Sequence, residues 1–315
     1  MGRLDISYLQ KQIRIISYIA KKNKKHHSYA VILHIFFTFV KVILYTKIAK
    51  IMENNEQLIA QCEAKAQQWL TPSFDIQTQE AVKAMLSNED KTELIESFYK
   101  DLEFGTGGLR GIMGAGSNRM NIYTVGMATQ GFANYLRKNF SDKTEISVVV
   151  CHDCRNNSRL FAETVADVFS ANGIKVYLFD DMRPTPECSF AIRYLKCQAG
   201  VNVTASHNPK EYNGYKAYWE DGAQVLAPHD TGIIDEVNKV KIADVKFNGN
   251  NQLITTIGKE IDEVYLNRIK EICIDPEVIK RQKDLKIVYT PLHGTGMMLI
   301  PQSLNLWGFE NVHCV

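Results

Sequence analysis

Three polar residues of different chemical types stand in a row after an expected strand. The apolar run 198–203 predicts a buried strand, and Ser206, His207 and Asn208 follow it almost directly. Enzymes with α/β folds expose reactive groups at strand ends, where a serine can be a nucleophile toward acyl or phosphoryl groups. The G-x-S-x-G elbow of serine hydrolases is missing here. A simple turn before Pro209 would explain the same residues, and the local pattern alone favours that turn.

A glycine-dense segment, residues 104–121, has a composition that suits an anion. Four glycines are closely spaced within it: Gly105, Gly107, Gly108 and Gly111. They follow an expected helix, and no Gly-Lys-Ser/Thr comes after them, so the segment is neither a dinucleotide fingerprint nor a Walker loop. Small residues let backbone N–H groups approach an anion, while Thr106 and Arg110 add a hydroxyl and a bidentate guanidinium. An ordinary cluster of turns would account for the same glycines.

Two further residues have acid/base or phosphate-binding chemistry and are associated with expected strands. Lys216 lies among aromatic and small residues in the expected strand 214–219, where partial burial would suit an acid/base group or a phosphate contact. The alternative is a solvated surface lysine. His293 stands near two glycines in residues 290–296, directly after the expected strand 286–290. A structural role is the simpler interpretation of this histidine.

The cysteines do not form a recognisable framework. Their number, seven, is odd, and they are spread through apparent helices and strands, which favours a reducing cytoplasm over an oxidising compartment. Cys151 and Cys154 have the C-x-x-C spacing at a strand end, and a redox motif can have that position. No second pair completes a zinc site.

Alternating strands and helices must position all these residues. The expected strands cover 145–150, 175–179, 198–203 and 214–219, and the expected helices 158–173 and 186–195. This alternation predicts an α/β fold in which a mixed sheet is layered with helices. A helical segment, residues 53–103, precedes it, and the polar stretch 245–259 is typical of a domain junction. A second α/β unit begins beyond it, with helix 260–272, strand 286–290, helix 297–308 and strand 312–315.

Charge divides the chain into two unlike parts. The formal net charge is +2, but residues 1–51 carry ten Lys or Arg and one acid, Asp5, which leaves −7 for residues 52–315. This mildly acidic body argues against nucleic acid as the partner. Within the basic part, residues 29–45 are apolar but at the short limit for a membrane span, and they include a histidine and a lysine. We therefore expect residues 1–51 to be a leader outside the fold, and membrane association only if that leader is a true anchor.

Three segments, taken in this order, resemble the α-D-phosphohexomutase superfamily: FGTGGLRG at 104–111, TASHNPKEYNGYK at 204–216 and TPLHGTG at 290–296. The resemblance is nearest to the phosphoglucomutase/phosphopentomutase branch and runs from about residue 55 to residue 315. It implies four parts of the chain: a leader at 1–51, a helical segment at 52–103, domain I with the phosphoserine loop at 104–244, and a linker with an incomplete domain II at 245–315.

The resemblance also implies roles for individual residues. Ser206 would be the phosphorylated serine whose phosphate helps to hold Mg²⁺, with His207 and Asn208 orienting that phosphate. Lys216 would be a general acid/base, and Arg110 a contact to the reacting phosphate. Further phosphate-binding residues would be Thr106, Gly107 and His293. CHDCRNNS matches the family's Asp-x-Arg-x-x-Ser stretch behind the serine loop at Asp153, Arg155 and Ser158, which makes the two cysteines incidental.

The implied activity is that of a mutase that interconverts a sugar 1-phosphate and a 6- or 5-phosphate through a bisphosphate, with Mg²⁺ and a glucose 1,6-bisphosphate type of activator. The family's Asp-x-Asp-x-Asp-Arg metal loop, its sugar loop and its C-terminal phosphate loop are not found in residues 286–315. We therefore expect an N-terminal portion that is inactive alone, in the cytoplasm, with a phosphorylated sugar as its ligand. A non-catalytic phosphosugar-binding or regulatory protein is the alternative. The sequence predicts neither the sugar nor the oligomeric state.

Overall fold

The computed structural model describes Lys47, residues 53–105 and residues 107–315. Thr106 and nearly all of the expected leader, residues 1–51, therefore lie outside the described residues. Contacts divide the chain into two units, 1–64 and 65–315, and residues 53–64 of the first unit are helical. No helix in the described part combines the length and the apolar character needed to cross a bilayer.

Short helical elements open the second unit: η1 (Gln68–Leu70), α3 (Ile76–Ser87) and α4 (Thr92–Phe98). Asp75 caps α3 by accepting a hydrogen bond from the Thr78 N–H at 2.8 Å. The other oxygen of Asp75 accepts from the Tyr123 hydroxyl at 2.7 Å. Trp69 and the Tyr123 ring meet edge to face, so aromatic packing joins this segment to the helix that begins at residue 122.

A six-stranded mixed sheet forms the centre of the unit. In spatial order its strands are β1 (Gly108–Ile112), β5 (Tyr212–Trp219), β4 (Ala199–Val203), β2 (Ser147–His152), β3 (Lys175–Phe179) and β6 (Ile254–Ile257). The last four are mutually parallel, and β5 is antiparallel to both β4 and β1. Every residue of β2 and β4 is buried, as the nearly continuous apolar runs in their sequences require. The predicted α/β class with a mixed sheet is confirmed.

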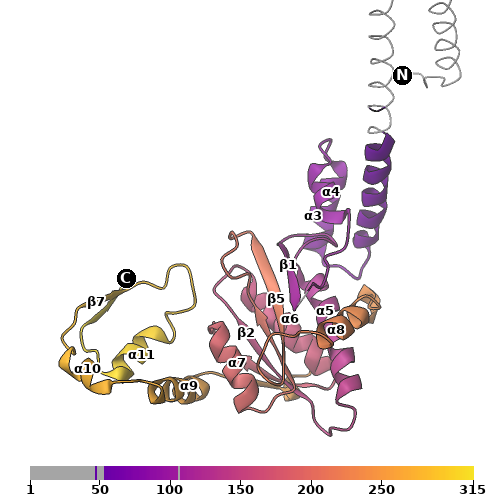
Figure 1. Cartoon of the computed structure of the whole chain (residues 1–315). Coiled ribbons are helices and arrows are strands. Elements are labelled where there is room, and N and C mark those ends of the chain that lie inside the picture. The colour runs from indigo at the N-terminus through magenta and orange to yellow at the C-terminus, as the bar shows by residue number, and fades with distance from the viewer. Residues whose placement is uncertain (1–46, 48–52, 106) are drawn as a thin grey trace, which may run out of the picture. The chain divides into compact units, whose positions relative to one another are not determined.

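Helices cover both faces of the sheet (Figure 1). One face packs against α5 (Ile122–Asn139), α6 (Ser158–Ala171) and α8 (His229–Val237), with Phe132 and Phe169 in its core. The other face packs against α7 (Thr185–Tyr194) and α9 (Lys259–Glu271), with Cys188 and Ile261 in its core. Since side chains alternate along a strand, neighbouring residues of one strand serve opposite layers.

Two strands lie where no strand was predicted. β1 lies inside the glycine-dense segment, whose composition is poor for a strand. The glycine at 108 is needed because a Cβ there would come within 1.7 Å of the Tyr215 carbonyl oxygen on β5. β6 lies in the polar stretch 245–259 that we interpreted as a domain junction, and it pairs with β3 at the sheet edge. The sheet therefore extends past residue 244, the expected end of domain I.

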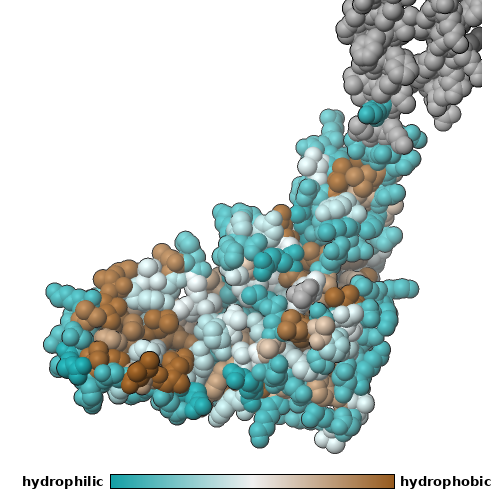
Figure 2. All heavy atoms as spheres, in the orientation of Figure 1, coloured by the Kyte–Doolittle hydropathy of each residue, from teal (hydrophilic) through white to brown (hydrophobic). Residues whose placement is uncertain are grey.

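The chain continues beyond α9 with smaller elements: α10 (Pro276–Arg281), β7 (Ile287–Tyr289), α11 (Ile300–Trp307) and β8 (Val312–Cys314). β7 and β8 form a separate two-stranded parallel sheet, and the strand and helix predictions for this part are close to these bounds. None of these four elements contains a buried residue. Figure 2 shows hydrophobic side chains gathered at the surface of this segment.

Candidate active site

Residues 204–211 connect β4 to β5, and we call them, together with Tyr212 at the start of β5, the serine loop. Ser206 lies in this loop with φ of +57°, in the left-handed region. Its N–H donates to Thr204 Oγ1 at 3.0 Å, and the Asn208 N–H donates to the Ala205 carbonyl at 3.1 Å. These contacts close a tight turn that leaves Ser206 exposed, with its Oγ 3.4 Å from His207 Nδ1. The serine hydroxyl is thus presented at a strand end, as a nucleophile or phosphoryl carrier requires.

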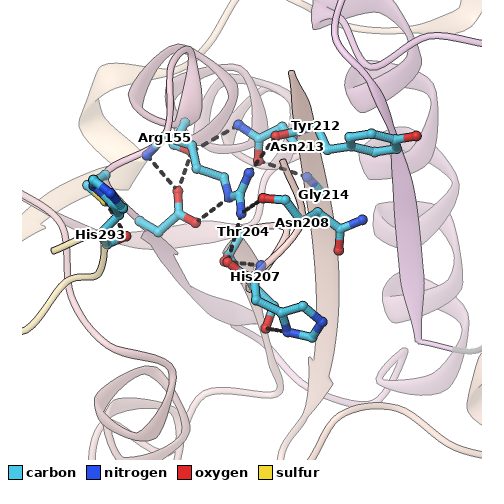
Figure 3. A network of polar contacts seen from close by, with 12 residues as sticks. Arg155, Thr204, His207, Asn208, Tyr212, Asn213, Gly214 and His293 are labelled. Atoms are coloured by element: carbon cyan, nitrogen blue, oxygen red, sulfur yellow. Dashed lines mark hydrogen bonds and ion pairs between the residues drawn. The ribbon is translucent and has the colours of Figure 1, made fainter. Parts of the chain in front are cut away.

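Arg155 holds the serine loop from behind. Its two terminal nitrogens donate hydrogen bonds to four backbone carbonyls, those of Ser206 (2.7 Å), Asn208 (2.6 Å), Pro209 (2.8 Å) and Tyr212 (3.0 Å). Figure 3 shows the arginine reaching into the loop beside Asn208 and Tyr212. Asp153 pairs with Arg155 Nε at 3.3 Å and accepts from the Ser158 hydroxyl at 2.6 Å. The Asp-x-Arg-x-x-Ser stretch therefore does lie behind the serine loop.

Arg110 joins the glycine-dense segment to the serine loop. It lies on β1 opposite Gly214 of β5, and its Nη1 donates to Asn208 Oδ1 at 3.1 Å. Gly214 is required at this point, because a Cβ there would lie 2.5 Å from the Thr204 carbonyl oxygen. Sequence reasoning did not identify Gly214, although the Asn-Gly pair at 213–214 was a visible signal of close backbone packing.

Lys216 lies on the same sheet face as Arg110, two residues beyond Gly214 on β5. It pairs with Asn202 on β4 and with Gly108 on β1, and its side chain is half-buried. Burial lowers the pKa of the Lys216 ammonium, the nearby Arg110 charge lowers it further, and Asp153 opposes the shift. A lysine with a lowered pKa can exchange a proton more readily near neutral pH than a solvated one.

Gly107 and His293 are held beside the site by different backbone contacts. Gly107 has φ of +83°, and its carbonyl accepts from the Ala217 N–H (2.9 Å) and from Gln224 Nε2 (3.2 Å), so the glycine turn lies against β5. The carbonyl of His293 accepts from the Cys154 thiol at 3.6 Å, which places the segment around His293 beside the loop that carries Arg155. The His293 imidazole makes no hydrogen bond to another described residue.

The C-x-x-C pair does not have the environment of a redox motif. Cys151 is fully buried and Cys154 is exposed. Burial raises the pKa of the Cys151 thiol well above its usual value, and contact with the Cys188 thiol adds to the shift. A thiol that stays protonated is a poor nucleophile.

Mg²⁺ prefers oxygen ligands, and carboxylates above all. Two cationic side chains contact the serine loop, Arg110 at Asn208 and Arg155 at the Ser206 carbonyl. The Asp153 carboxylate is occupied by Arg155 and Ser158. Among the described residues, no group of three or more His, Cys, Asp or Glu side chains could hold a metal ion. The side chains around Ser206 therefore do not form a Mg²⁺ site by themselves, and no chemical step below is routed through a metal.

Comparison with known proteins agrees with the α/β fold described above. Residues 101–244 match the family described as phosphoglucomutase/phosphomannomutase, alpha/beta/alpha domain I. Human phosphopentomutase is 39% identical over 248 residues, which cover 75% of this chain and 40% of the relative. Phosphoglucomutase from Staphylococcus haemolyticus is 38% identical over 240 residues, covering 74% and 42%.

A solved structure agrees with these matches. A putative phosphomannomutase from Thermus thermophilus aligns with a TM-score of 0.55 and 25% identity, over 69% of this chain and 46% of that one. The chain spans about two fifths of the length of the curated relatives it matches. The motifs, the first α/β domain and these relatives support the α-D-phosphohexomutase superfamily for this chain, and residues 101–244 are similar to domain I of the phosphoglucomutase/phosphomannomutase group.

Proposed function

We propose that Ser206 carries a phosphoryl group between the hydroxyls of a phosphorylated sugar, in a mutase that interconverts a sugar 1-phosphate and a 6- or 5-phosphate. The observation that carries this proposal is the exposed Ser206 Oγ at a strand end, in a loop that Arg110 contacts from β1. Phosphopentomutase and phosphoglucomutase relatives match over similar shares of the chain, so the proposal names a class of substrate and no single sugar.

In the transfer step, a sugar hydroxyl attacks the phosphorus on Ser206. The bond from phosphorus to Ser206 Oγ breaks as the bond to the sugar oxygen forms, the hydroxyl proton passes to a base, and the departing Ser206 Oγ takes up a proton. Lys216 in its neutral form is the base that we assign, because its pKa is lowered. The guanidinium of Arg110 would neutralise charge on the phosphoryl oxygens, which is the main contribution that proteins make to such transfers. The bisphosphate then turns over, and transfer of its other phosphate to Ser206 restores the phosphoserine and leaves the isomeric monophosphate.

Other parts of the proposal come from the superfamily. Ser206 would first be charged by a sugar bisphosphate, and Gly107, Asn208 and His293 would contact phosphate groups. Thr106 is assigned with them on sequence grounds alone. Mg²⁺ would require ligands beyond those around Ser206. We also propose that the protein acts in the cytoplasm, which the spread of its free cysteines favours.

The test is phosphoryl transfer to the chain itself. The full chain is incubated with glucose 1,6-bisphosphate and Mg²⁺, and phosphate is then located by intact-mass and fragment spectra. Interconversion of sugar phosphates is not expected of this chain alone, but the charging of Ser206 is a single transfer. We expect one phosphoryl group on Ser206, none in Ser206→Ala, and an unchanged result in the control Ser87→Ala, whose serine is exposed at the end of α3. Phosphate on another residue would contradict the proposal. Calorimetric binding of glucose 1-phosphate with no phosphate incorporated would support the alternative, a phosphosugar-binding protein.

A further inference from the structure

Arg155 is a positive side chain in the candidate site that has no free donor directed at a ligand. Its guanidinium has five N–H donors, and its side chain is 12% exposed. All of the hydrogen bonds found for its two terminal nitrogens end on serine-loop carbonyls, and its Nε is paired with Asp153. Arg155 therefore binds the backbone of the loop. What this binding does depends on which way the C=O and N–H groups of the loop's peptides point.

A trans peptide is planar, so its C=O and N–H point in opposite directions. The described cis bonds are Ala227–Pro228 and Leu292–His293, so the peptides in the serine loop are trans. The Ser206 and Pro209 carbonyls point toward Arg155. The N–H groups of the following residues, His207 and Lys210, must therefore point away from it.

These two amides are free to bind a ligand. His207 and Lys210 are both exposed, and neither N–H donates a hydrogen bond to any other residue in the described part of the chain. The left-handed φ of Ser206, +57°, turns the backbone directly before the first of these two amides. In the sequence, Ser206 stands directly before His207, the first of the two residues with these amides.

We propose that Arg155 is a positioning residue that turns the serine loop into a backbone cradle for phosphate, with the N–H groups of His207 and Lys210 as its donors. The cradle would hold the phosphoryl group that Ser206 carries, so this inference rests on the proposed function and deepens it. Arg155 itself does not touch the phosphate. Lysine cannot replace it fully, because an ammonium has three donors on a point charge and cannot span four carbonyls as a planar guanidinium does.

Hydrogen exchange tests the positioning role in the full chain. The amides of Asn208 and Tyr212 are protected by bonds inside the loop, to the carbonyls of Ala205 and Pro209. In Arg155→Gln these two amides should exchange about tenfold faster or more, since bonds from a charged donor are lost. Arg155→Lys should lie between Arg155→Gln and the wild type, and it serves in place of Arg155→Gln if that variant does not fold.

The matched control is Arg159→Gln, which removes a nearby arginine that pairs with the exposed Glu163. This variant should leave the exchange of both loop amides unchanged. Unchanged exchange in both Arg155 variants would overturn the positioning role, as would equal acceleration in Arg159→Gln.

A titration with inorganic phosphate, followed by amide NMR of the ¹⁵N-labelled chain, tests the cradle. The His207 and Lys210 amide signals should shift in the wild type and in Ser206→Ala, and should shift much less in Arg155→Lys. If these amides respond to phosphate but Ser206 never becomes phosphorylated, the mutase proposal fails and the cradle stands. If Ser206 is phosphorylated and neither amide responds to phosphate or to the phosphoserine, the cradle is overturned and the mutase proposal stands. If neither amide responds and Ser206 is not phosphorylated, the cradle is overturned as well.

Discussion

The six-stranded sheet and the C-terminal segment, residues 276–315, have similar sequence patterns but very different burial. Val149 in β2 is fully buried, whereas Val288 in β7 is 70% exposed. The sheet has helices on both faces, while β7 and β8 pair only with each other within the described residues. Two strands make a marginal sheet in water. An apolar β-branched run therefore predicts a strand, but whether that strand stabilises the protein depends on the layers around it.

Removing the ion pair at the start of α9 should give the largest effect. Arg183 is 2% exposed and donates to both oxygens of Asp262 at 2.6 and 2.9 Å, which connects the segment just before α7 to α9. Arg183→Met leaves the Asp262 carboxylate buried without its partner, so we expect a loss of about 3–5 kcal/mol in the free energy of unfolding. Denaturant unfolding measures it. The double variant Arg183→Met/Asp262→Leu should recover most of the loss, and a single variant as stable as the wild type would contradict this account.

A matched pair of isoleucine truncations compares the two regions directly. Ile192 on α7 is fully buried against the sheet, and Ile274, just before α10, is fully exposed. Ile192→Ala should cost about 2–5 kcal/mol, because it removes apolar contacts and leaves a cavity. Ile274→Ala should change the free energy of unfolding by less than about 0.5 kcal/mol. Urea unfolding of both variants checks this, and a large loss in Ile274→Ala would show that the segment is covered in solution.

Counted per pH unit, a smaller effect than the loss of either buried side chain is a pH dependence of stability that originates in the layer between the sheet and α7. Glu187 is fully buried, and neither carboxylate oxygen has a hydrogen-bond partner. Burial, assisted by the nearby Asp262, raises the pKa of Glu187 to about 9. The folded state then holds a proton that the unfolded state releases above about pH 4.5. The contribution of Glu187 to the free energy of unfolding is fully present below that pH and is lost as the pH rises toward 9. The free energy of unfolding then falls by up to about 1.4 kcal/mol per pH unit.

Glu187→Gln should flatten this slope, since an amide does not titrate. Unfolding free energies at about pH 6 and about pH 8.5 provide the measurement. Glu163→Gln, which changes an exposed glutamate of α6, is the control and should keep the wild-type slope. A steep slope that persists in Glu187→Gln would assign the pH dependence to another group.

Sequence patterns predicted the interior strands well because their burial requires continuous apolar runs. The expected strand 145–150 is β2 at 147–152, and the expected strand 198–203 is β4 at 199–203. β1 and β6 were missed for a physical reason: their residues suit close backbone approach and an edge position. Helices α5 and α8 were not identified individually, although α5 starts with a clear signal, the Asn121 capping box.

The residues of the candidate site could be predicted from sequence motifs, but the contacts between them could not. Sequence reasoning placed Arg110, Asn208 and Lys216 in one site, and the structure brings Arg110 and Asn208 into contact. The role of Arg155 could not be derived in the same way, because its partners are backbone carbonyls and any residue type supplies those. The assigned roles of these residues stay predictions.

The left-handed backbone at Ser206 has a consequence for how this position can evolve. Threonine carries the same hydroxyl and, as chemistry alone, could accept a phosphoryl group. A β-branched side chain is strongly disfavoured at φ of +57°, however, whereas glycine and asparagine tolerate it. Glycine and asparagine would fit the backbone at this position but lack the hydroxyl. Threonine has the hydroxyl but does not fit the backbone. Descendants of this gene should therefore show serine at 206, or a loop that has lost its chemistry, with few intermediates between.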